Sequence, residues 1–431
     1  MPRSTHRAAR PTLGTALAIA LATALTTLAA CSAADAPGKA LAPGGDEERI
    51  EVTNDSPDFA GRVQITNRDT VPLSPDSAQS ASAARAYASV GPSAPSVTTF
   101  IRTALVTPPT LNGAALQASH VVVKDDYAFV SYMTLGDATQ GALEVFDISS
   151  PSSPRLVSQA LLKNSDVLAL AVDDNYVYLA TSSDDPTQTE RATLVRIGLK
   201  SGRLSSAVTR IPLPSYAATG VDLSSKWVFV TSGSGGPGVG GLTILDRNTL
   251  TKVSSDIFPD ARAVTGAAGN FAAVSQGSPA RLRLYNASTG ALTSTVAMQG
   301  GTIPDSKSAV ALWGDWGFVA TGDGGVQVVD LPAGRVRGVV PRPNVPGIPA
   351  NEAVTNAVTV ANDLILAADG GAGIAVTWSD YKSVKSGATP RLVPLGRLLL
   401  PGSANFAASS DDALFVAQGL AGLQVLAINT P

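Results

Sequence analysis

Short apolar runs joined by pairs of polar residues recur along this chain between residues 125 and 412. After each pair, a second apolar run opens with an aromatic or apolar residue. Asp, Asn and Gly tolerate the positive backbone angles of a two-residue hairpin turn, so each unit predicts a β-hairpin. The first members of successive pairs lie 44 to 51 residues apart, a period typical of β-propeller blades. The seven pairs are Asp125-Asp126, Asp174-Asn175, Ser225-Lys226, Gly269-Asn270, Gly314-Asp315, Asn362-Asp363 and Asp411-Asp412.

Two further strands follow most of these hairpins. A third apolar run usually opens with Gly, as in residues 141–147, 241–246 and 325–330. A fourth run follows a turn that contains Pro or Gly, as in residues 154–158 and 334–338. Blades pack on both faces, so near-continuous apolar strands are expected in place of strict alternation. The pattern predicts an all-β fold, a seven-bladed β-propeller over residues 98–431.

The two ends of this region predict how the ring closes. The last repeat stops after its third strand, at residues 422–428. Residues 99–106 form an alternating strand that has no hairpin of its own. Pairing the two would complete the seventh blade and cover an edge that would otherwise promote aggregation. We therefore expect the last blade to be closed by an N-terminal strand.

The first repeat carries a motif that resembles a known family. In residues 141–157 an apolar strand ends in Asp147, and Ser, Pro and a second Pro precede the next strand. This arrangement resembles the LVIVD repeat of bacterial and archaeal surface proteins, with the full motif only in the first repeat. Residues 286–292 resemble the turn of YVTN-type and quinoprotein-like propellers. We expect the Asp or Asn that ends the third strand to accept N–H bonds from the following turn. These residues are Asp147, Asp246, Asn286 and Asp330.

The first 31 residues resemble a lipoprotein signal. Three arginines precede an apolar run over residues 13–30, which ends in small residues as a cleavable signal does. Residues 28–31, Leu-Ala-Ala-Cys, resemble the lipobox of bacterial lipoproteins. The resemblance implies a signal peptide at residues 1–30 and lipidation at Cys31, with outer-membrane sorting in a two-membrane organism because Ser32 is not acidic. An ordinary signal peptide with a chance cysteine is the alternative.

Residues 31–97 read as a lipid-anchored, low-complexity tether. They are rich in Ala, Ser, Pro and Gly and cannot bury enough apolar surface to offset their ordering entropy. Two fragments, residues 49–53 and 62–66, alternate like short strands and could pair with an exposed sheet edge. The sequence leaves open whether residues 49–66 are ordered.

Composition excludes several classes of function. The chain has 31 basic and 34 acidic residues, a net charge of −3 and no basic stripe, which argues against nucleic-acid binding. Its single cysteine rules out an internal disulfide. After residue 30, no apolar run is long enough to cross a bilayer. We expect a monomer that contacts the membrane only through its acyl anchor.

Candidate chemistry is sparse. After signal cleavage His120 is the only histidine, and its equivalents in the other repeats are mostly apolar, so no ring of ligands is predicted. Trp227 and Trp316 read as packing residues between blades. Acidic residues gather in the loops between second and third strands and in those that enter the first strands, which share one propeller face. The first set is the candidate binding face and comprises Asp137, Asp184, Asp185, Glu190, Asp323 and Asp369, and the second comprises Asp166, Asp260, Asp305 and Glu352.

The sequence therefore predicts a lipid-anchored, extracytoplasmic binding or scaffold module for a protein or an envelope polymer. No catalytic residue is assigned and no cofactor is expected. The alternative is a calcium-dependent hydrolase of lactonase type, because several carboxylates at a channel mouth could hold Ca²⁺ as a Lewis acid. A bound ion on the ring axis would favour the enzyme, and an open channel would favour the binding module.

Overall fold

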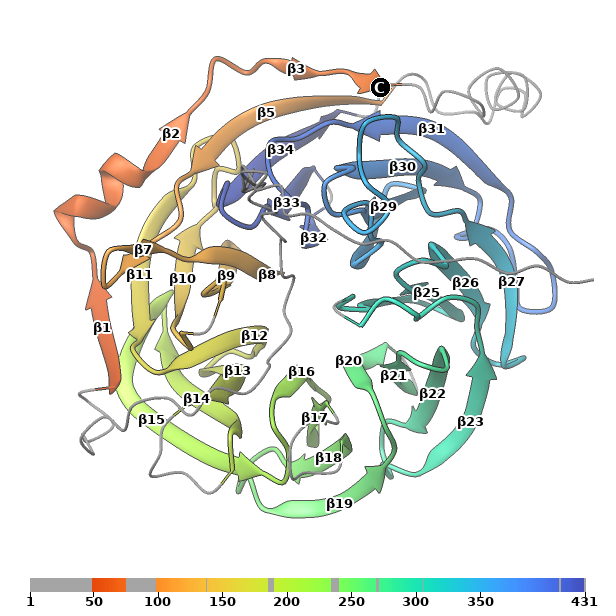
Figure 1. Cartoon of the computed structure of the whole chain (residues 1–431), viewed down its shortest axis with the longest axis horizontal. Coiled ribbons are helices and arrows are strands. Elements are labelled where there is room, and N and C mark those ends of the chain that lie inside the picture. Colours follow the sequence, from red (N-terminus) through yellow and green to blue (C-terminus); the bar gives the residue numbers. More distant parts are fainter. Residues whose placement is uncertain are drawn as a thin grey trace, which may run out of the picture.

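Seven sheets of four or more strands surround a central axis and form a seven-bladed β-propeller (Figure 1). The computed structural model describes residues 49–74, 98–136, 138–184, 190–233, 240–268, 271–304, 306–410 and 412–429. The predicted signal peptide, Cys31 and tether residues 32–48 and 75–97 lie outside the described residues. The all-β prediction and the number of blades are both confirmed.

The first four blades follow one another along the chain, each running from the ring centre outward. Blade 1 contains β8 (Gln117–Lys124), β9 (Tyr127–Met133), β10 (Gly141–Asp147) and β11 (Arg155–Leu162). Blade 2 contains β12 (Ser165–Val172), β13 (Tyr176–Ser183), β14 (Ala192–Lys200) and β15 (Arg203–Leu213). Blade 3 contains β16 (Ala218–Leu223), β17 (Trp227–Ser232), β18 (Gly241–Asp246) and β19 (Lys252–Ile257). Blade 4 contains β20 (Ala261–Ala268), β21 (Phe271–Gln276), β22 (Arg281–Asn286) and β23 (Leu292–Ala297).

The last three blades continue the order, and blade 7 takes its fourth strand from the N-terminal end of the propeller sequence. Blade 5 contains β24 (Val310–Trp313), β25 (Trp316–Ala320), β26 (Val326–Asp330) and β27 (Arg335–Val340). Blade 6 contains β28 (Ala357–Ala361), β29 (Leu364–Ala368), β30 (Ile374–Ser379) and β31 (Leu392–Leu398). Blade 7 contains β32 (Phe406–Ser409), β33 (Ala413–Ala417), β34 (Leu423–Asn429) and β5 (Thr99–Val106). A small separate hairpin joins β6 (Thr110–Leu111) and β7 (Ala114–Ala115).

The closing strand is where the sequence predicts it. β5 pairs antiparallel with β34, in a register that runs from Leu423 opposite Val106 to Asn429 opposite Thr99. Phe100 and Ala104 of β5 are fully buried. The last blade is therefore completed by an N-terminal strand, as predicted.

The predicted hairpins are present, with two kinds of turn. Asp125, Gly314, Asn362 and Asp363 have φ between 48° and 62°, the positive values expected of the polar pair. In blade 2 the residue before the pair closes the turn, because Asp173 Oδ1 accepts N–H bonds of 2.8 and 2.7 Å. Ser224 occupies the same place in blade 3 and accepts a bond from the next strand's first N–H. A polar pair thus predicts the hairpin, while neighbouring side chains decide the turn type.

The residue that ends the third strand caps the following turn. Asp147 Oδ1 accepts the N–H of Ser149 at 3.0 Å, and Asp330 Oδ1 accepts that of Ala333 at 3.1 Å. Asp246 and Asn286 each accept two such bonds. The predicted structural role of these four residues is confirmed.

Residues 49–74 lie along the outer wall of the ring, and we call this segment the strap (Figure 1, red to orange). It contains β1 (Ile50–Asn54), the 3₁₀ helix η1 (Pro57–Arg62), β2 (Val63–Ile65), β3 (Thr70–Val71) and β4 (Leu73–Ser74). β1 pairs with β11 of blade 1, β2 and β3 with β5 of blade 7, and β4 with β31 of blade 6. β1 and β2 lie within the two fragments, residues 49–53 and 62–66, that alternate in the sequence. Each of these two strands pairs with the edge of an outer strand.

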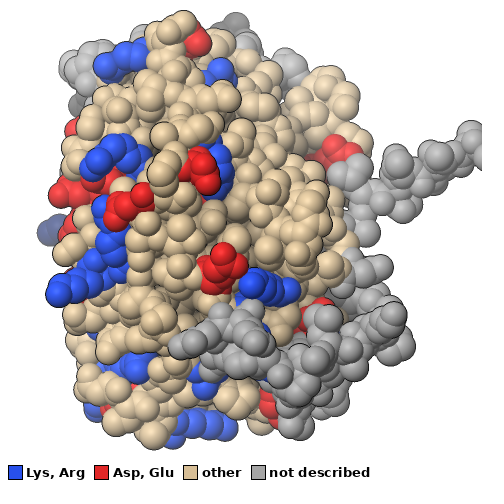
Figure 2. Space-filling model, turned by 90° about the vertical axis from the view of Figure 1, so that its left-hand side faces the viewer, with Lys and Arg blue, Asp and Glu red and all other residues tan. Residues whose placement is uncertain are grey.

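Burial and charge fix the strap to the wall. Ile50, Phe59 and Val71 are at most 7% exposed and join three different core clusters. Arg62 forms an ion pair with Glu144 of β10, a carboxylate with no solvent exposure. Its Nη2 lies 3.0 Å from Glu144 Oε2. Seen from this side, acidic and basic side chains lie together near one edge of the wall, beside a broad uncharged area (Figure 2).

Apolar residues between blades form the core. Trp227 and Trp316 are 7% and 1% exposed, and each also reaches a neighbouring blade through its indole N–H. Trp227 donates to the carbonyl oxygen of Ser288, and Trp316 donates to that of Val384, both at 3.1 Å. Both tryptophans are thus packing residues between blades, as expected.

Candidate functional site

The connections between strands separate onto two faces. The residue after a third strand donates its N–H to the hairpin turn of the same blade, as Ile148 does to Asp126 and Leu331 to Asp315. Hairpin turns and third-to-fourth-strand turns therefore share one face, which we call the turn face. The second-to-third-strand loops and the segments entering the next blade share the opposite face, the loop face.

Loops on the loop face differ between blades. Seven residues separate Met133 from Gly141 in blade 1, and eight separate the same strands in blades 2 and 3. Blades 5 to 7 use five residues with a repeated Gly-x-x-Gly sequence, at residues 322–325, 370–373 and 419–422. The first glycine of each forms a β-bridge to the blade that follows, and the three bridges are Gly322 to Thr355, Gly370 to Ala404 and Gly419 to Ala118.

These contacts confirm that the two sets of acidic loops share one face. Of the candidate binding residues, Asp184 is exposed and Glu190 is partly exposed on the loop face of blade 2. Asp323 is partly exposed and accepts two bonds from Thr302, at 2.9 and 2.7 Å. Two further candidates, Asp137 and Asp185, lie outside the described residues.

Asp369 lies inside the protein. It is 1% exposed, and its Oδ2 lies 3.1 Å from Nη1 of Arg397 in a buried ion pair. Its Oδ1 accepts the hydroxyl of Thr355 at 2.6 Å. Asp369 therefore ties two strands of blade 6 and the entry of that blade together, and it does not contribute to the accessible face.

Asp166 of blade 2 lies where blades 1 and 2 meet, and its carboxylate contacts Thr134 of blade 1. Burial raises the pKa of Asp166 to about 7, and the nearby charge of Asp184 adds to the rise. The backbone N–H and the hydroxyl of Thr134 donate to Asp166 Oδ1 at 3.1 and 2.9 Å. These two hydrogen bonds favour the charged carboxylate and so oppose the rise in its pKa. Sequence reasoning named both carboxylates but did not foresee their coupling.

The described part of the chain contains no preassembled metal site. No group of three or more His, Cys, Asp or Glu side chains there is arranged to hold a metal ion. Asp260, another loop-face carboxylate, pairs with the buried Arg262 at 2.9 Å. The described carboxylates of this face are thus largely engaged in contacts within the protein.

His120 lies on the first strand of blade 1 and packs on Phe406 of blade 7, with ring centroids 3.7 Å apart. Burial and the charge of Lys307 lower the pKa of His120 to about 3, so the ring is neutral at physiological pH. Its Nδ1 is buried without a hydrogen-bond partner. Lys307 Nζ donates to the carbonyl oxygen of Leu168 at 3.3 Å. His120 is thus a packing residue at the join of the first and last blades.

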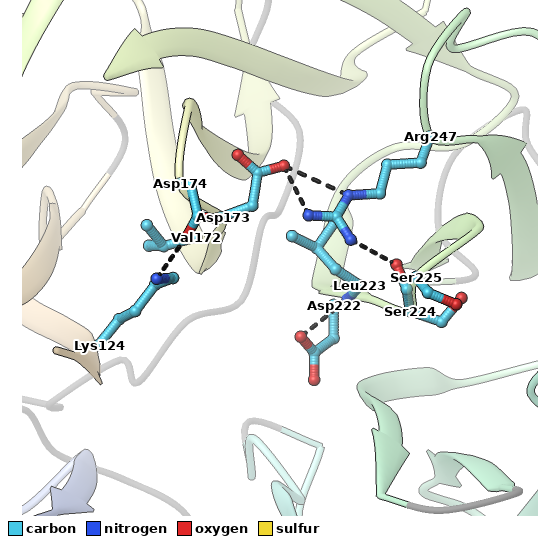
Figure 3. Close-up of a pocket in the computed structure, with 9 residues that line it drawn as sticks. All are labelled: Lys124, Val172, Asp173, Asp174, Asp222, Leu223, Ser224, Ser225 and Arg247. Atoms are coloured by element: carbon cyan, nitrogen blue, oxygen red, sulfur yellow. Dashed lines mark hydrogen bonds and ion pairs between the residues drawn. The ribbon is translucent and has the colours of Figure 1, made fainter. Parts of the chain in front are cut away.

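The turn face holds a polar pocket of about 460 Å³ between blades 1, 2 and 3 (Figure 3). Asp173 Oδ2 accepts Nη2 of Arg247 at 2.9 Å, and Lys124 Nζ lies 2.7 Å from Asp174 Oδ1. Burial raises the pKa of Asp222, which accepts the N–H of Gly266 from blade 4 at 2.6 Å. The pocket charges are therefore mostly paired with each other. The sequence signal for this pocket was the polar residue directly before each of the first three hairpin pairs, Lys124, Asp173 and Ser224, and it was missed.

Comparison with known proteins agrees with the repeat motif. Residues 117–161 match the family model of the LVIVD repeat. The matched range corresponds to blade 1, from the first residue of β8 to the penultimate residue of β11. No curated protein matches this chain. Among the described residues, none of the helices is both long and apolar enough to cross a membrane.

Proposed function

We propose that this chain is a lipid-anchored, extracytoplasmic propeller that acts as a binding or scaffold module for a protein or an envelope polymer. The order of arginines, apolar run, small residues and Cys31 supports the anchor. The propeller fold and the LVIVD match support the binding role, since propellers present loops on a rigid ring and function resides in those loops.

One observation carries the proposal furthest, namely the unequal loops of the loop face. Blades 1 to 3 have second-to-third-strand loops of seven or eight residues, whereas those of blades 4 to 7 have four or five. The exposed Asp184 and the partly exposed Glu190 flank the longer loop of blade 2. A longer connection offers more residues for contact with a partner, and added loop length costs the fold little. The binding surface is therefore assigned to the loop face of blades 1 to 3.

The test is charge reversal on this face. The variant carries Asp184→Lys and Glu190→Lys, and the control carries Asp58→Lys on the exposed part of the strap. Both are compared with the unmodified chain for capture of envelope proteins and for co-sedimentation with isolated envelope polymer. Capture should fall for the loop-face variant only, with Tm nearly unchanged because exposed charges contribute little to stability. Equal capture by all three proteins would refute the assignment.

A calcium titration of the same preparation tests the enzymatic alternative. A bound ion would raise Tm in proportion to ln(1 + [L]/Kd), and a chelator would reverse the rise. We expect no shift at millimolar calcium. A rise of several degrees that Asp323→Asn abolishes would favour the calcium-dependent hydrolase over the binding module.

A further inference from the structure

Blade 7 presents an uncharged surface on the loop face. Its three connections there contain no Asp, Glu, Lys or Arg, whereas every other blade has a charged residue in at least one equivalent connection. The three connections are the segment entering the blade, its second-to-third-strand loop and the segment leaving for blade 1, residues 399–405, 418–422 and 107–116. We call them together the blade 7 surface. At its rim Arg62 donates to the carbonyl oxygen of Thr107 at 2.6 Å, and the charge of Arg62 is paired with the buried Glu144.

The three segments touch one another. A Cβ placed on Gly402 would lie 2.7 Å from the carbonyl oxygen of Gln418. A Cβ placed on Gly422 would lie 3.1 Å from Cδ of Pro108. The second-to-third-strand loop of blade 7 therefore contacts both other segments, and the three form one continuous surface.

Apolar side chains of this surface are exposed. Leu420 and Leu399 are 53% and 52% exposed, the largest values among the leucines of the described residues. Pro401, Ala114 and Ala115 are exposed as well. A single exposed leucine is ordinary, but a continuous apolar surface without charges indicates contact with a protein or a membrane.

The chain enters the ring on this same face. The carbonyl oxygen of Arg49 accepts the N–H of Lys163 at 2.9 Å, and Lys163 lies in the segment entering blade 2. Figure 1 shows β1, which follows Arg49, on the same side of the ring as β7, which belongs to the blade 7 surface. In the proposed function Cys31 carries the acyl anchor, so residues 32–48 join the membrane to this point and span at most about 60 Å.

The point of entry decides which face lies nearer the anchor. To bring the turn face to the membrane, the tether would first have to run back along the wall. That path is about 25 Å, the length of an eight-residue strand such as β11. The loop face needs no such path, so the membrane is the apolar phase that the blade 7 surface reaches most readily.

We propose that the blade 7 surface docks on the bilayer that holds the acyl anchor, with Leu399 and Leu420 in the headgroup region. The inference rests on the lipid anchor of the proposed function. The anchor keeps this surface at a high local concentration next to the lipid, so a weak apolar contact is enough. Because the segments contain no charge, docking removes no charged group from water. The partner of the proposed function would then be one that lies at the membrane surface.

Fluorescence quenching of the lipidated protein tests the proposal. The protein is produced from the full chain and reconstituted in vesicles of phosphatidylethanolamine and phosphatidylglycerol. Cys31 is the only cysteine and is acylated in the proposed function, so a fluorophore can be attached to Leu420→Cys alone. Asp412→Cys is the matched control, an exposed position on the turn face of the same blade. A lipid with a nitroxide near its headgroup should quench position 420 by about twofold and leave position 412 unchanged, since a docked apolar face enters roughly 5–10 Å into that region.

The two ways of failing are distinguishable. Equal quenching at positions 420 and 412 in vesicle-bound protein would overturn the docking and leave the anchor intact. Protein without an acyl group that stays off the vesicles would refute the anchor and the docking together. In that case Cys31 itself would react with the fluorophore.

Variants identify the apolar contact, with the fluorophore moved to Ala114→Cys. Leu399→Ser combined with Leu420→Ser should reduce quenching at position 114 to the level of position 412. Leu292→Ser is the matched control, an equally simple loss of an exposed leucine on β23, and it should leave the quenching unchanged. Quenching should also be equal at low and high salt, because the surface is uncharged. Quenching that survives the double change, or that salt abolishes, would refute apolar docking on lipid. A response that requires added envelope protein would refute it as well and identify a protein as the occupant.

Discussion

The two sides of this ring are built differently. On one side, blades 6, 7 and 1 carry strap strands outside their outer strands, and glycine bridges link blade 5 to 6, 6 to 7 and 7 to 1. On the other side, blades 2, 3 and 4 have four strands each, and two of them have longer loops on the loop face. We call these the closing side and the open side.

The difference follows from where the chain is discontinuous. Within blade 7, β34 and β5 come from opposite ends of the propeller sequence, so only hydrogen bonds and packing hold them together. β2 and β3 pair with the free edge of β5 and leave it between two strands. The closing side therefore concentrates stabilising contacts at the one junction without a covalent link. The open side has no such junction, and among the described residues its outer strands pair with no further strand.

Removal of the strap should give the largest effect. A chain that starts at residue 75 exposes the edges of three blades and loses the buried side chains Ile50, Phe59 and Val71. Burial of such side chains stabilises by about 1.5–3 kcal/mol each, partly offset by the entropy of ordering the strap. We expect a large fall in Tm and aggregation, measured by calorimetry and light scattering. A chain that starts at residue 49 is the control and should retain its Tm, and equal stability of the two truncations would contradict this view of the closing side.

Replacement of Arg62 tests the strap at a single contact. Arg62→Ala leaves Glu144 buried and unpaired apart from the amide of Gln159 at 2.7 Å. A broken buried ion pair costs about 3 kcal/mol or more, so denaturant unfolding should show a clear loss. Adding Glu144→Gln should restore part of the stability, because no buried charge then remains. The matched control is Arg203→Ala, which removes an exposed pair with Asp55 and should change stability little.

Much of the closing side could be predicted from the sequence. The incomplete last repeat and the alternating strand before the first hairpin were enough to place β5, and its observed bounds are those expected. The strap was foreseen only in part. Alternation marked residues 49–53 and 62–66 as strand-like, but the choice of edge depends on contacts such as Arg62 with Glu144, which lie 82 residues apart. Local patterns carry no information on such a pairing.

The candidate site was harder to predict because Asp has several roles in loops. Asp369 and Asp184 read alike in the sequence, since each lies in a loop after a second strand. Asp369 is buried because Arg397 reaches it from the outer strand of the same blade, whereas Asp184 is exposed. The repeated Gly-x-x-Gly could have marked the bridged loops of blades 5 to 7. It would have separated Asp323 and Asp369 from the longer loops of the open side.

A glycine bridge of the closing side gives a smaller test. Gly370 has a φ of 59°, and a Cβ there would meet the carbonyl oxygen of Glu352. Gly314, in a hairpin turn, has a φ of 55° and open space around the same position. Each Gly→Ala change costs about 1 kcal/mol for the left-handed backbone, and Gly370→Ala adds the clash. Gly370→Ala should therefore destabilise by about twice as much in denaturant unfolding, and equal losses would show that the bridge contributes nothing.

The smallest effect lies on the open side, where Asp166 carries an unfavourable charge. Its pKa is about 7 in the folded protein and near 3.9 in the unfolded chain, so between these values the folded state binds more protons. The free energy of unfolding therefore falls as pH rises from about 4 to about 7.

Asp166→Asn keeps an acceptor for Thr134 without the charge, and it should be more stable than the unmodified chain by on the order of 1 kcal/mol at pH 8, with little difference at pH 4. Asp184→Asn should shift this transition to lower pH, because the charge of Asp184 contributes to the raised pKa of Asp166. Melting curves from pH 4 to 8 check both variants. If the stability of the unmodified chain and that of Asp166→Asn changed equally with pH, the charge of Asp166 would not destabilise the folded protein.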